Sequence, residues 1–304
     1  MTRSDSTTPR KALGAALLVA VVAATSLALG QVVSCASQAQ DPEPSPPAEP
    51  PSSAISVPLA PTAAPSADDD VCADPVEGTC QVVPTNTTQL LLVTSGSWKD
   101  FEGRLQRYER RCARAPWVPV GEPTEVMLGR HGMGWGRGLH PDDQPGPVKA
   151  EHDQRSPAGV FDLGEARGYA TEPPPGTTWP FQHSGSAWRC MDNPASDAYN
   201  TFVPTGGMIS PTPAGMAPRE VIFDLMVFVL HNTDPVQRGA GSCVFLHVWS
   251  KQGVPTQGCV AMPRPALGDI LAWLSLERRP VLAQMPQDVL DAVAQAWGLP
   301  VAVR

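Results

Sequence analysis

Short apolar runs separated by clusters of Gly, Pro and Asp dominate the sequence from Val71 onward. Runs of this length between turn-forming residues are typical of β-strands joined by loops. We therefore expect strands at 89–94, 125–129, 159–163, 221–230 and 243–249. Helical spacing of apolar residues occurs only at 265–276 and at 287–297, and Gly298 follows the second segment as a typical helix end. The pattern predicts a mainly β domain with a few helices, two of them C-terminal.

The first 35 residues carry a different pattern. An unbroken apolar run at 12–29 follows Arg10 and Lys11, as in a signal-peptide core or a short membrane anchor. The residues Val-Val-Ser before Cys35 resemble a bacterial lipobox, in which the chain is cut before the cysteine and the cysteine is acylated. We expect residues 1–35 to be a signal peptide with Cys35 as the lipid attachment site. A plain cleaved signal and an uncleaved anchor are the alternatives, and each version exports the remaining chain to the cell envelope, facing the periplasm or cell wall.

Residues 36–70 have the composition of a tether. They contain nine of the 35 prolines and few aliphatic residues, which leaves too little apolar surface to order the segment. A proline-rich chain of this kind is semi-extended, at about 3 Å per residue. We therefore divide the chain into a signal peptide (1–35), a tether (36–70) and a single domain (71–304).

Charge and composition exclude several classes of protein. The formal net charge is -8, and a nucleic-acid-binding protein needs a basic face to neutralise phosphates. Charged residues make up 17% and hydrophobic residues 42% of the chain, values that fit neither general disorder nor a polytopic membrane protein. We expect a monomer that has no nucleic-acid partner and meets the membrane through its N-terminal lipid.

The segment 243–262 carries the most informative chemistry. Alternation in the strand at 243–249 places His247 and Trp249 on the same face as Cys243, and the loop that follows can bring Cys259 back beside His247. An imidazole can hold a cysteine as thiolate, and amides around Gly258 could stabilise the oxyanion of acyl transfer. Taken alone, one such pair fits a buried half-cystine and a core histidine better than a catalytic pair.

Several further segments resemble the catalytic domain of the YkuD-type L,D-transpeptidases, in the long branch of that family. The histidine stands in Gly-Ser-Cys-Val-Phe-Leu-His (241–247) and the cysteine in Thr-Gln-Gly-Cys-Val-Ala-Met (256–262). Further similar segments follow the same order as in that branch and extend the resemblance over most of 85–285: 132–136, 149–168, 190–196, 199–200, 231–232 and 239–242.

The resemblance implies a β-rich L,D-transpeptidase-like sandwich or barrel that acts on peptidoglycan stem peptides without a cofactor. Cys259 would attack the carbonyl between an L-centre and the following D-residue, release the terminal D-amino acid, and pass the acyl group to an amine. His247 would be the base, and Thr256 and Gly258 would shape the nucleophile loop. We also expect alkylation of Cys259 to persist below the normal thiol pKa and to weaken in His247→Ala.

Three more residues receive roles in substrate binding. The resemblance places His231 and Asn232 near the site, in a supporting or substrate-contacting role. Trp249 could line a substrate groove, and a core role is at least as compatible with its sequence context.

Departures from the family leave two alternatives open. The commoner branch has histidine at the position of Gln257 and Arg or Asn at the position of Ala261, and 151–154 is Glu-His-Asp-Gln where small residues are usual. The chain could therefore be an L,D-carboxypeptidase of the same fold, or a non-catalytic peptidoglycan-binding lipoprotein.

Disulfides are expected among the cysteines other than Cys35 and Cys259. Cys190 and Cys243 both fall inside family-like segments, which implies a Cys190–Cys243 disulfide. A second disulfide is expected among Cys72, Cys80 and Cys112, with the pairing open.

No metal site is expected, because His231, His247 and Cys259 are sixteen and then twelve residues apart and match no short ligand pattern. The other four histidines are expected in loops or at the surface: His131, His140, His152 and His183.

Overall fold

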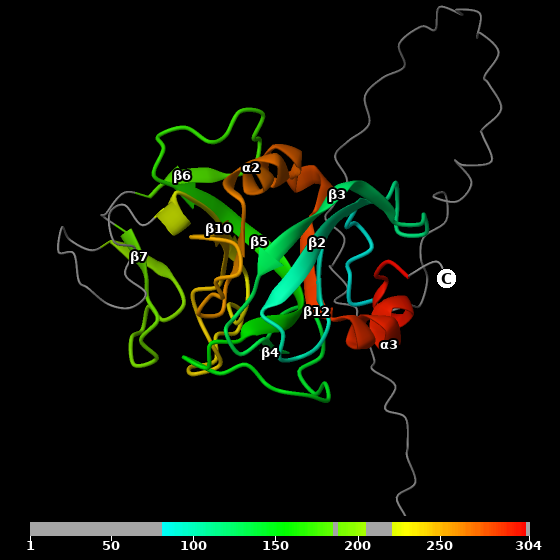
Figure 1. Cartoon of the computed structure of the whole chain (residues 1–304), viewed down its shortest axis with the longest axis horizontal. Coiled ribbons are helices and arrows are strands. Elements are labelled where there is room, and N and C mark those ends of the chain that lie inside the picture. The colour runs from blue at the N-terminus through cyan, green and yellow to red at the C-terminus, as the bar shows by residue number, and fades with distance from the viewer. Residues whose placement is uncertain (1–80, 185–187, 205–220, 302–304) are drawn as a thin grey trace, which may run out of the picture. The chain divides into compact units, whose positions relative to one another are not determined.

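A sheet that closes on itself organises the chain (Figure 1). The computed structural model describes residues 81–184, 188–204 and 221–301. The strands are β1 (Gln89–Ser95), β2 (Glu102–Glu109), β3 (Val118–Met127), β4 (Met133–Trp135), β5 (Ser156–Gly168), β6 (Phe181–His183), β7 (Trp188–Cys190), β8 (Phe202–Pro204), β9 (Leu225–Val229), β10 (Phe245–Val248), β11 (Val260–Met262) and β12 (Val281–Pro286). The helices are α2 (Arg264–Trp273), α3 (Gln287–Trp297) and the 3-10 turns η1 (Val221–Phe223) and η2 (Leu276–Arg278).

Strand pairing gives the closed path. Neighbouring strands follow the order β12-β1-β2-β3-β11-β10-β9-β5, and β5 pairs back with β12, so that in the described residues 8 strands form a barrel. β4 and β6 each pair with β5, while β7 and β8 form a separate two-stranded sheet. The pairing that positions the site is parallel, between β10 and β11, with Leu246 opposite Val260.

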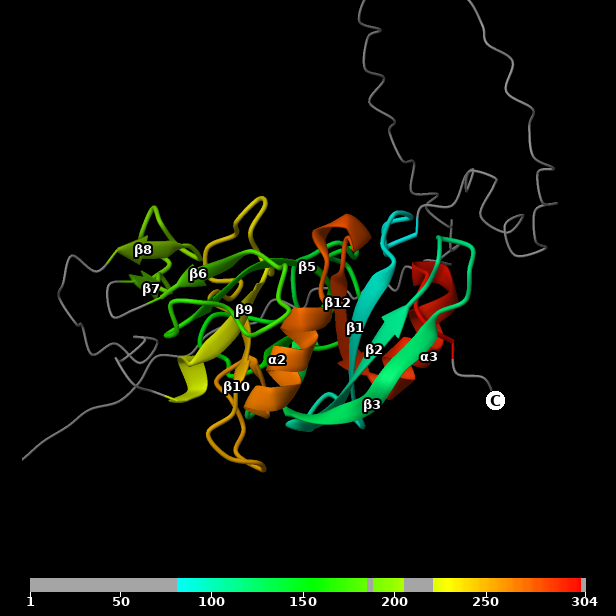
Figure 2. The ribbon, with the colours of Figure 1, turned by 90° about the horizontal axis from the view of Figure 1, so that it is seen from above.

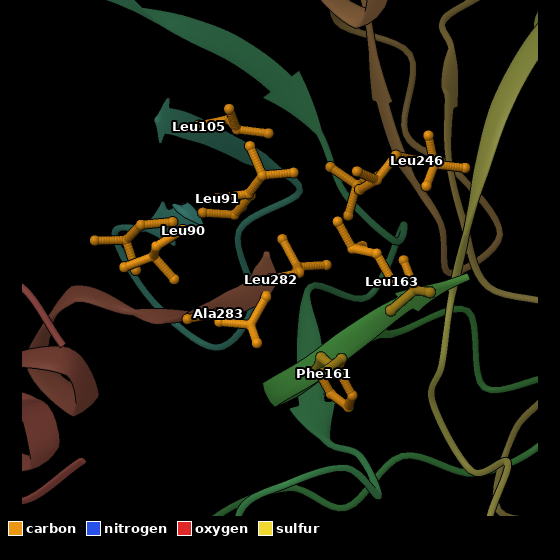
Figure 3. Close-up of a cluster of buried hydrophobic side chains, with 14 of the residues drawn as sticks. Leu90, Leu91, Leu105, Phe161, Leu163, Leu246, Leu282 and Ala283 are labelled. Carbon is orange, nitrogen blue, oxygen red and sulfur yellow. The ribbon is translucent and has the colours of Figure 1, made fainter. Parts of the chain in front are cut away.

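The main core lies on both faces of the barrel strands. Leu90, Leu91 and Val93 of β1 are fully buried, as are Leu282 and Ala283 of β12. Figure 3 shows side chains of this cluster on these strands and on β2, β5 and β10, among them Leu105, Phe161 and Leu246. Strands with both faces covered have continuous apolar sequences, and this explains why β1 reads Gln-Leu-Leu-Leu-Val.

The two helices cover different parts of the barrel. α2 buries Leu267, Ile270 and Leu271 and packs against β9 and β10. α3 buries Leu290, Ala294 and Trp297 against β1 and β12 and lies at the end of the molecule opposite to β7 and β8 (Figure 2). It ends at Gly298, whose φ of 72° is the left-handed conformation expected for a helix C-cap.

The mainly β fold with few helices is confirmed. Seven strands were not predicted: β2, β4, β6, β7, β8, β11 and β12. Of the two longest, β2 reads Glu-Gly-Arg-Leu-Gln-Arg-Tyr-Glu and buries only Leu105 fully, whereas β12 is buried on both faces and has no alternation. The strand expected at 243–249 is shorter in the structure and runs from Phe245 to Val248. Cys243 has a φ of 55°, which an extended strand does not allow.

The expected signal peptide with Cys35, the tether, Cys72 and Cys80 lie outside the described residues. Within the part of the chain that is described, no helix is long and apolar enough to cross a membrane.

Candidate active site

The two faces of β10 have different surroundings. Val244, Leu246 and Val248 point into the main core. Phe245 and His247 point to the other side, where they line a cavity of about 760 Å³. The alternation expected from the sequence is therefore confirmed.

Cys259 faces the same cavity. It immediately precedes β11, whose parallel pairing places Val260 beside Leu246 and Ala261 beside His247. Besides His247 and Cys259, the cavity is lined by Trp249, Thr256 and Gly258. The structure thus brings together five of the predicted site residues.

Hydroxyl groups fix the backbone of the nucleophile loop. The Thr256 hydroxyl donates to the Cys259 carbonyl oxygen at 2.8 Å and accepts the Gly258 amide at 3.1 Å. The Ser156 hydroxyl donates to the same carbonyl at 2.8 Å and accepts the Gly129 amide. The Cys259 carbonyl is therefore held from two sides. Since the Gly258 amide is taken by Thr256, the Cys259 amide is the better candidate for an oxyanion donor.

Gly258 is required by its conformation and by its neighbours. Its φ is 137°, in the region that side chains rarely adopt, and an added Cβ would lie 3.0 Å from the Arg155 carbonyl oxygen. A larger residue would displace the loop that carries Cys259.

The Cys259 thiol is free and, in this resting state, neutral. It donates to the Cys243 carbonyl oxygen at 3.7 Å. Burial raises the pKa of Cys259 to about 11, against smaller lowering effects from a Phe245 backbone hydrogen bond and the charge of Lys149. This is opposite to the low thiol pKa that we expected from the pairing of Cys259 with His247, because the effect of burial is larger than that of the positive charge nearby.

His247 is a neutral imidazole in the same apolar surroundings. Its Nδ1 lies 2.8 Å from the Val248 carbonyl oxygen, and a further backbone hydrogen bond joins the ring to Ile222. Burial lowers the pKa of His247, so the ring is able to accept a proton at neutral pH. Within the described residues, the hydrogen-bond partners of the thiol are backbone groups and not this imidazole. Proton transfer from Cys259 therefore requires the ring or the thiol to turn.

His231 and Asn232 are buried and are not among the residues that line the cavity. The Nδ1 of His231 accepts the Arg137 amide at 3.1 Å, and Nε2 lies 3.1 Å from the Ala240 carbonyl oxygen. Asn232 donates to the Gln237 and Gly241 carbonyl oxygens. Of the two roles expected for this pair, the geometry favours the supporting one. Burial, together with the charge of Lys149, lowers the pKa of His231 to about 3.

Asn200 is a further residue of the site whose role the sequence did not show. Its side-chain amide donates to the His231 and Asn232 carbonyl oxygens, and its oxygen accepts the Cys243 amide at 2.8 Å. Asn200 thereby sets the position of the Cys243 carbonyl that receives the thiol. A side chain that bonds only backbone groups leaves no signal in sequence spacing.

The unusual segment at 151–154 is a turn with defined contacts. Glu151 accepts a hydrogen bond from the Tyr199 hydroxyl, and burial followed by this contact raises the pKa of Tyr199. His152 and Gln154 both have a φ of 59°, a conformation that glycine adopts more readily.

The expected Cys190–Cys243 disulfide is present, and both cysteines line the cavity. Cys112 is also disulfide-bonded. His140 lies in the loop between β4 and β5, one of the two expected locations, but it is only 4% exposed and packs between aromatic rings. Within residues 81–184, 188–204 and 221–301, no three or more His, Cys, Asp or Glu side chains are grouped so that they could hold a metal ion.

Comparison with known proteins adds no relative: no family model matches the chain, and no curated protein matches it.

Proposed function

We propose that the protein is a cysteine acyltransferase of the L,D-transpeptidase type that acts on peptidoglycan stem peptides. The observation that carries this proposal is a free Cys259 on a doubly anchored loop, which shares one cavity with a neutral His247 from the adjacent parallel strand. The resemblance of 241–247 and 256–262 to that family supplies the substrate class.

The reaction begins with proton transfer from the Cys259 sulfur to the imidazole of His247. The sulfur then attacks the carbonyl carbon between the L-centre and the D-residue, and the negative charge that forms on oxygen is stabilised by the Cys259 amide. The imidazolium returns the proton to the leaving amine, so that the D-residue departs and a thioester remains. An amine of a second stem then displaces the sulfur and forms the cross-link.

The resting state fits a nucleophile that is activated only when substrate is bound. The high pKa of the Cys259 thiol keeps it protonated, and the Val248 carbonyl oxygen holds the His247 ring by a hydrogen bond at Nδ1. Catalytic hydrogen bonds are commonly long or misaligned without substrate and tighten in the complex. The substrate would then close the cavity, exclude water and align the two groups.

Two alternatives keep the same cavity. Water in place of the amine would make the protein an L,D-carboxypeptidase. The lack of a hydrogen bond between Cys259 and His247 in the described residues is what would be expected of a non-catalytic peptidoglycan-binding lipoprotein. In each case the chain would be tethered to the envelope through Cys35.

A mass measurement tests the proposal. The purified full chain is incubated with a carbapenem, which acylates nucleophilic cysteines of such sites, and is then weighed. We expect one covalent adduct on the wild type and on Val254→Ala at the cavity rim, and none on Cys259→Ser or Cys259→Ala. The absence of an adduct on the wild type, together with no release of D-amino acid from tetrapeptide-containing sacculi, would contradict enzyme activity and favour the binding protein.

A further inference from the structure

Lys149 is a buried lysine beside the nucleophile loop, and the reaction above gives it no role. It is 5% exposed and lines the cavity. Gly241 makes room for it, because an added Cβ there would lie 2.9 Å from Lys149 Cε. The ammonium lies close to the nucleophile loop: Lys149 Nζ is 3.7 Å from the position that a Cβ on Gly258 would take. Lysine is almost never buried without a partner, because its charge loses solvation.

Asp153 holds the Lys149 ammonium in a fixed position. Their ion pair measures 2.6 Å, and the Ala150 carbonyl oxygen accepts a second N–H of Lys149 at 2.9 Å. The carboxylate of Asp153 also accepts the amides of Ala150 and Arg155. An ammonium has three N–H groups, so one remains without a partner among the described residues.

The cavity has little other positive charge. Of the described residues that line it, Lys149 is the only lysine or arginine. Gln257 and Ala261 carry no charge, and the carboxylate of Glu151 accepts the Tyr199 hydroxyl. Asp192 is the second carboxylate that lines the cavity. The charge of Lys149 lowers the pKa of both Cys259 and His231, which is consistent with a positive potential at the thiol.

We propose that Lys149, held by Asp153, forms an anion-binding subsite for a carboxylate of the acyl donor next to Cys259. The inference rests on the proposed function, and it names the carboxylate of the D-residue that leaves. This carboxylate is one residue from the attacked carbonyl, and a buried ammonium with a free N–H is suited to a charge-assisted hydrogen bond with it.

The first test does not depend on turnover. Cys259 is alkylated with iodoacetate, which is an anion, and with iodoacetamide, which is neutral and of similar size, in the full chain. We expect the ratio of the iodoacetate rate to the iodoacetamide rate to fall about tenfold in Lys149→Gln, as a single charge-assisted contact would give. The ratio should be retained in Lys149→Arg and in Lys251→Gln, which removes an exposed charge from the neighbouring loop.

Two outcomes of this test would overturn the inference. An unchanged ratio in Lys149→Gln means that the ammonium does not attract anions to the sulfur. An equal fall in both rates means that Lys149 acts on the thiol alone. If Lys149→Gln fails to fold, Lys149→Met serves in its place, because it keeps the apolar stem and removes the charge, and the ratio should fall about tenfold as well. An unchanged ratio in that variant would contradict the subsite.

The second test separates this inference from the proposed function. Donor tetrapeptides with a free terminal carboxylate and with a terminal amide are compared for acylation of Cys259. We expect the wild type to favour the acid through a lower KM, and Lys149→Gln to lose this preference. Equal use of acid and amide by the wild type would overturn the carboxylate subsite and leave the proposed function intact. If neither donor acylates Cys259 while the iodoacetate preference persists, the proposed function fails and the anion site is supported.

Discussion

The two faces of β9 and β10 show how one sheet serves stability on one side and chemistry on the other. Leu225, Val227 and Val229 of β9 join the main core. Met226 and Phe228 alternate with them and form a small second cluster with Phe245 and Cys190. Cys243 and Cys259 pack against this second cluster. The core face is purely aliphatic at these positions, whereas the site face combines aromatic rings, a disulfide and the candidate nucleophile.

The two faces differ in the interactions that stabilise them. The core face is stabilised by apolar burial contributed by many strands. The site face has few buried residues, and it depends on the Cys190–Cys243 disulfide, on Asn200 and on the hydroxyls of Thr256 and Ser156. Changes on the two faces should therefore affect stability and reactivity in different proportions.

Removal of the disulfide should have the largest effect. The bond closes a loop with a sequence separation of 53, for which chain entropy gives a stabilisation of roughly 4 kcal/mol. We expect Cys190→Ala/Cys243→Ala to lose about this much free energy of unfolding, measured with urea. Alkylation of Cys259 by iodoacetamide should also become faster, because the Cys243 carbonyl is released.

Leu246→Ala is the matched control on the core face of the same strand. It should cost about 2–5 kcal/mol through a cavity in the main core. Alkylation of Cys259 in the folded protein should stay at the wild-type rate. Faster alkylation in Leu246→Ala, or an unchanged rate in the disulfide variant, would contradict the separation of the two faces.

Acid should destabilise the protein through its buried histidines. The pKa of His231 is lowered to about 3 in the folded state, against about 6.5 when unfolded, so the unfolded state binds the proton first. This contribution to stability is present above pH 6.5 and is lost as the pH falls toward 3, at about 1.4 kcal/mol per pH unit. The lowered pKa values of His140 and His247 add in the same direction.

The measurement is urea unfolding between pH 7 and pH 4. His231→Gln should reduce the slope of stability against pH by about one proton, whereas His183→Gln, which changes an exposed ring, should leave it as in the wild type. An identical slope in His231→Gln would show that this ring is protonated in the folded state.

Thr256→Val should weaken the nucleophile loop. It has nearly the same shape but lacks the hydroxyl that bonds the Cys259 carbonyl and the Gly258 amide, which should cost about 1–3 kcal/mol. Acylation of Cys259 by a carbapenem should slow, and Thr256→Ser should restore it. Equal acylation rates in Thr256→Val and the wild type would show that the Thr256 hydroxyl does not position Cys259 for reaction.

His152→Gly should have the smallest effect, with the opposite sign. The side chain is exposed and the backbone has a φ of 59°, so glycine relieves strain and should raise the free energy of unfolding by about 0.5–1 kcal/mol. Ala150→Gly, two residues earlier and without a positive φ, should lower it by a similar amount. Stabilisation in both variants, or in neither, would contradict this view of the turn.

The sequence predicted much of this arrangement and missed its electrostatics. Alternation at 243–249 placed His247 on the cavity face correctly, and the helical spacing at 287–297 matches α3. The roles of Lys149 and Asn200 escaped notice because they arise from contacts between segments that are far apart in the chain. The burial of His140 and the high pKa of Cys259 likewise depend on the surrounding tertiary structure, which local composition does not describe.

The most direct test of the central claim is to trap the acyl-enzyme. The purified full chain is mixed with a tetrapeptide donor and no amine acceptor, quenched in acid and analysed by intact mass and peptide mapping. The account predicts a mass gain equal to the donor without its terminal D-residue, located on Cys259 and absent from Cys259→Ala. An acyl group on another residue, or a gain that persists in Cys259→Ala, would contradict the account.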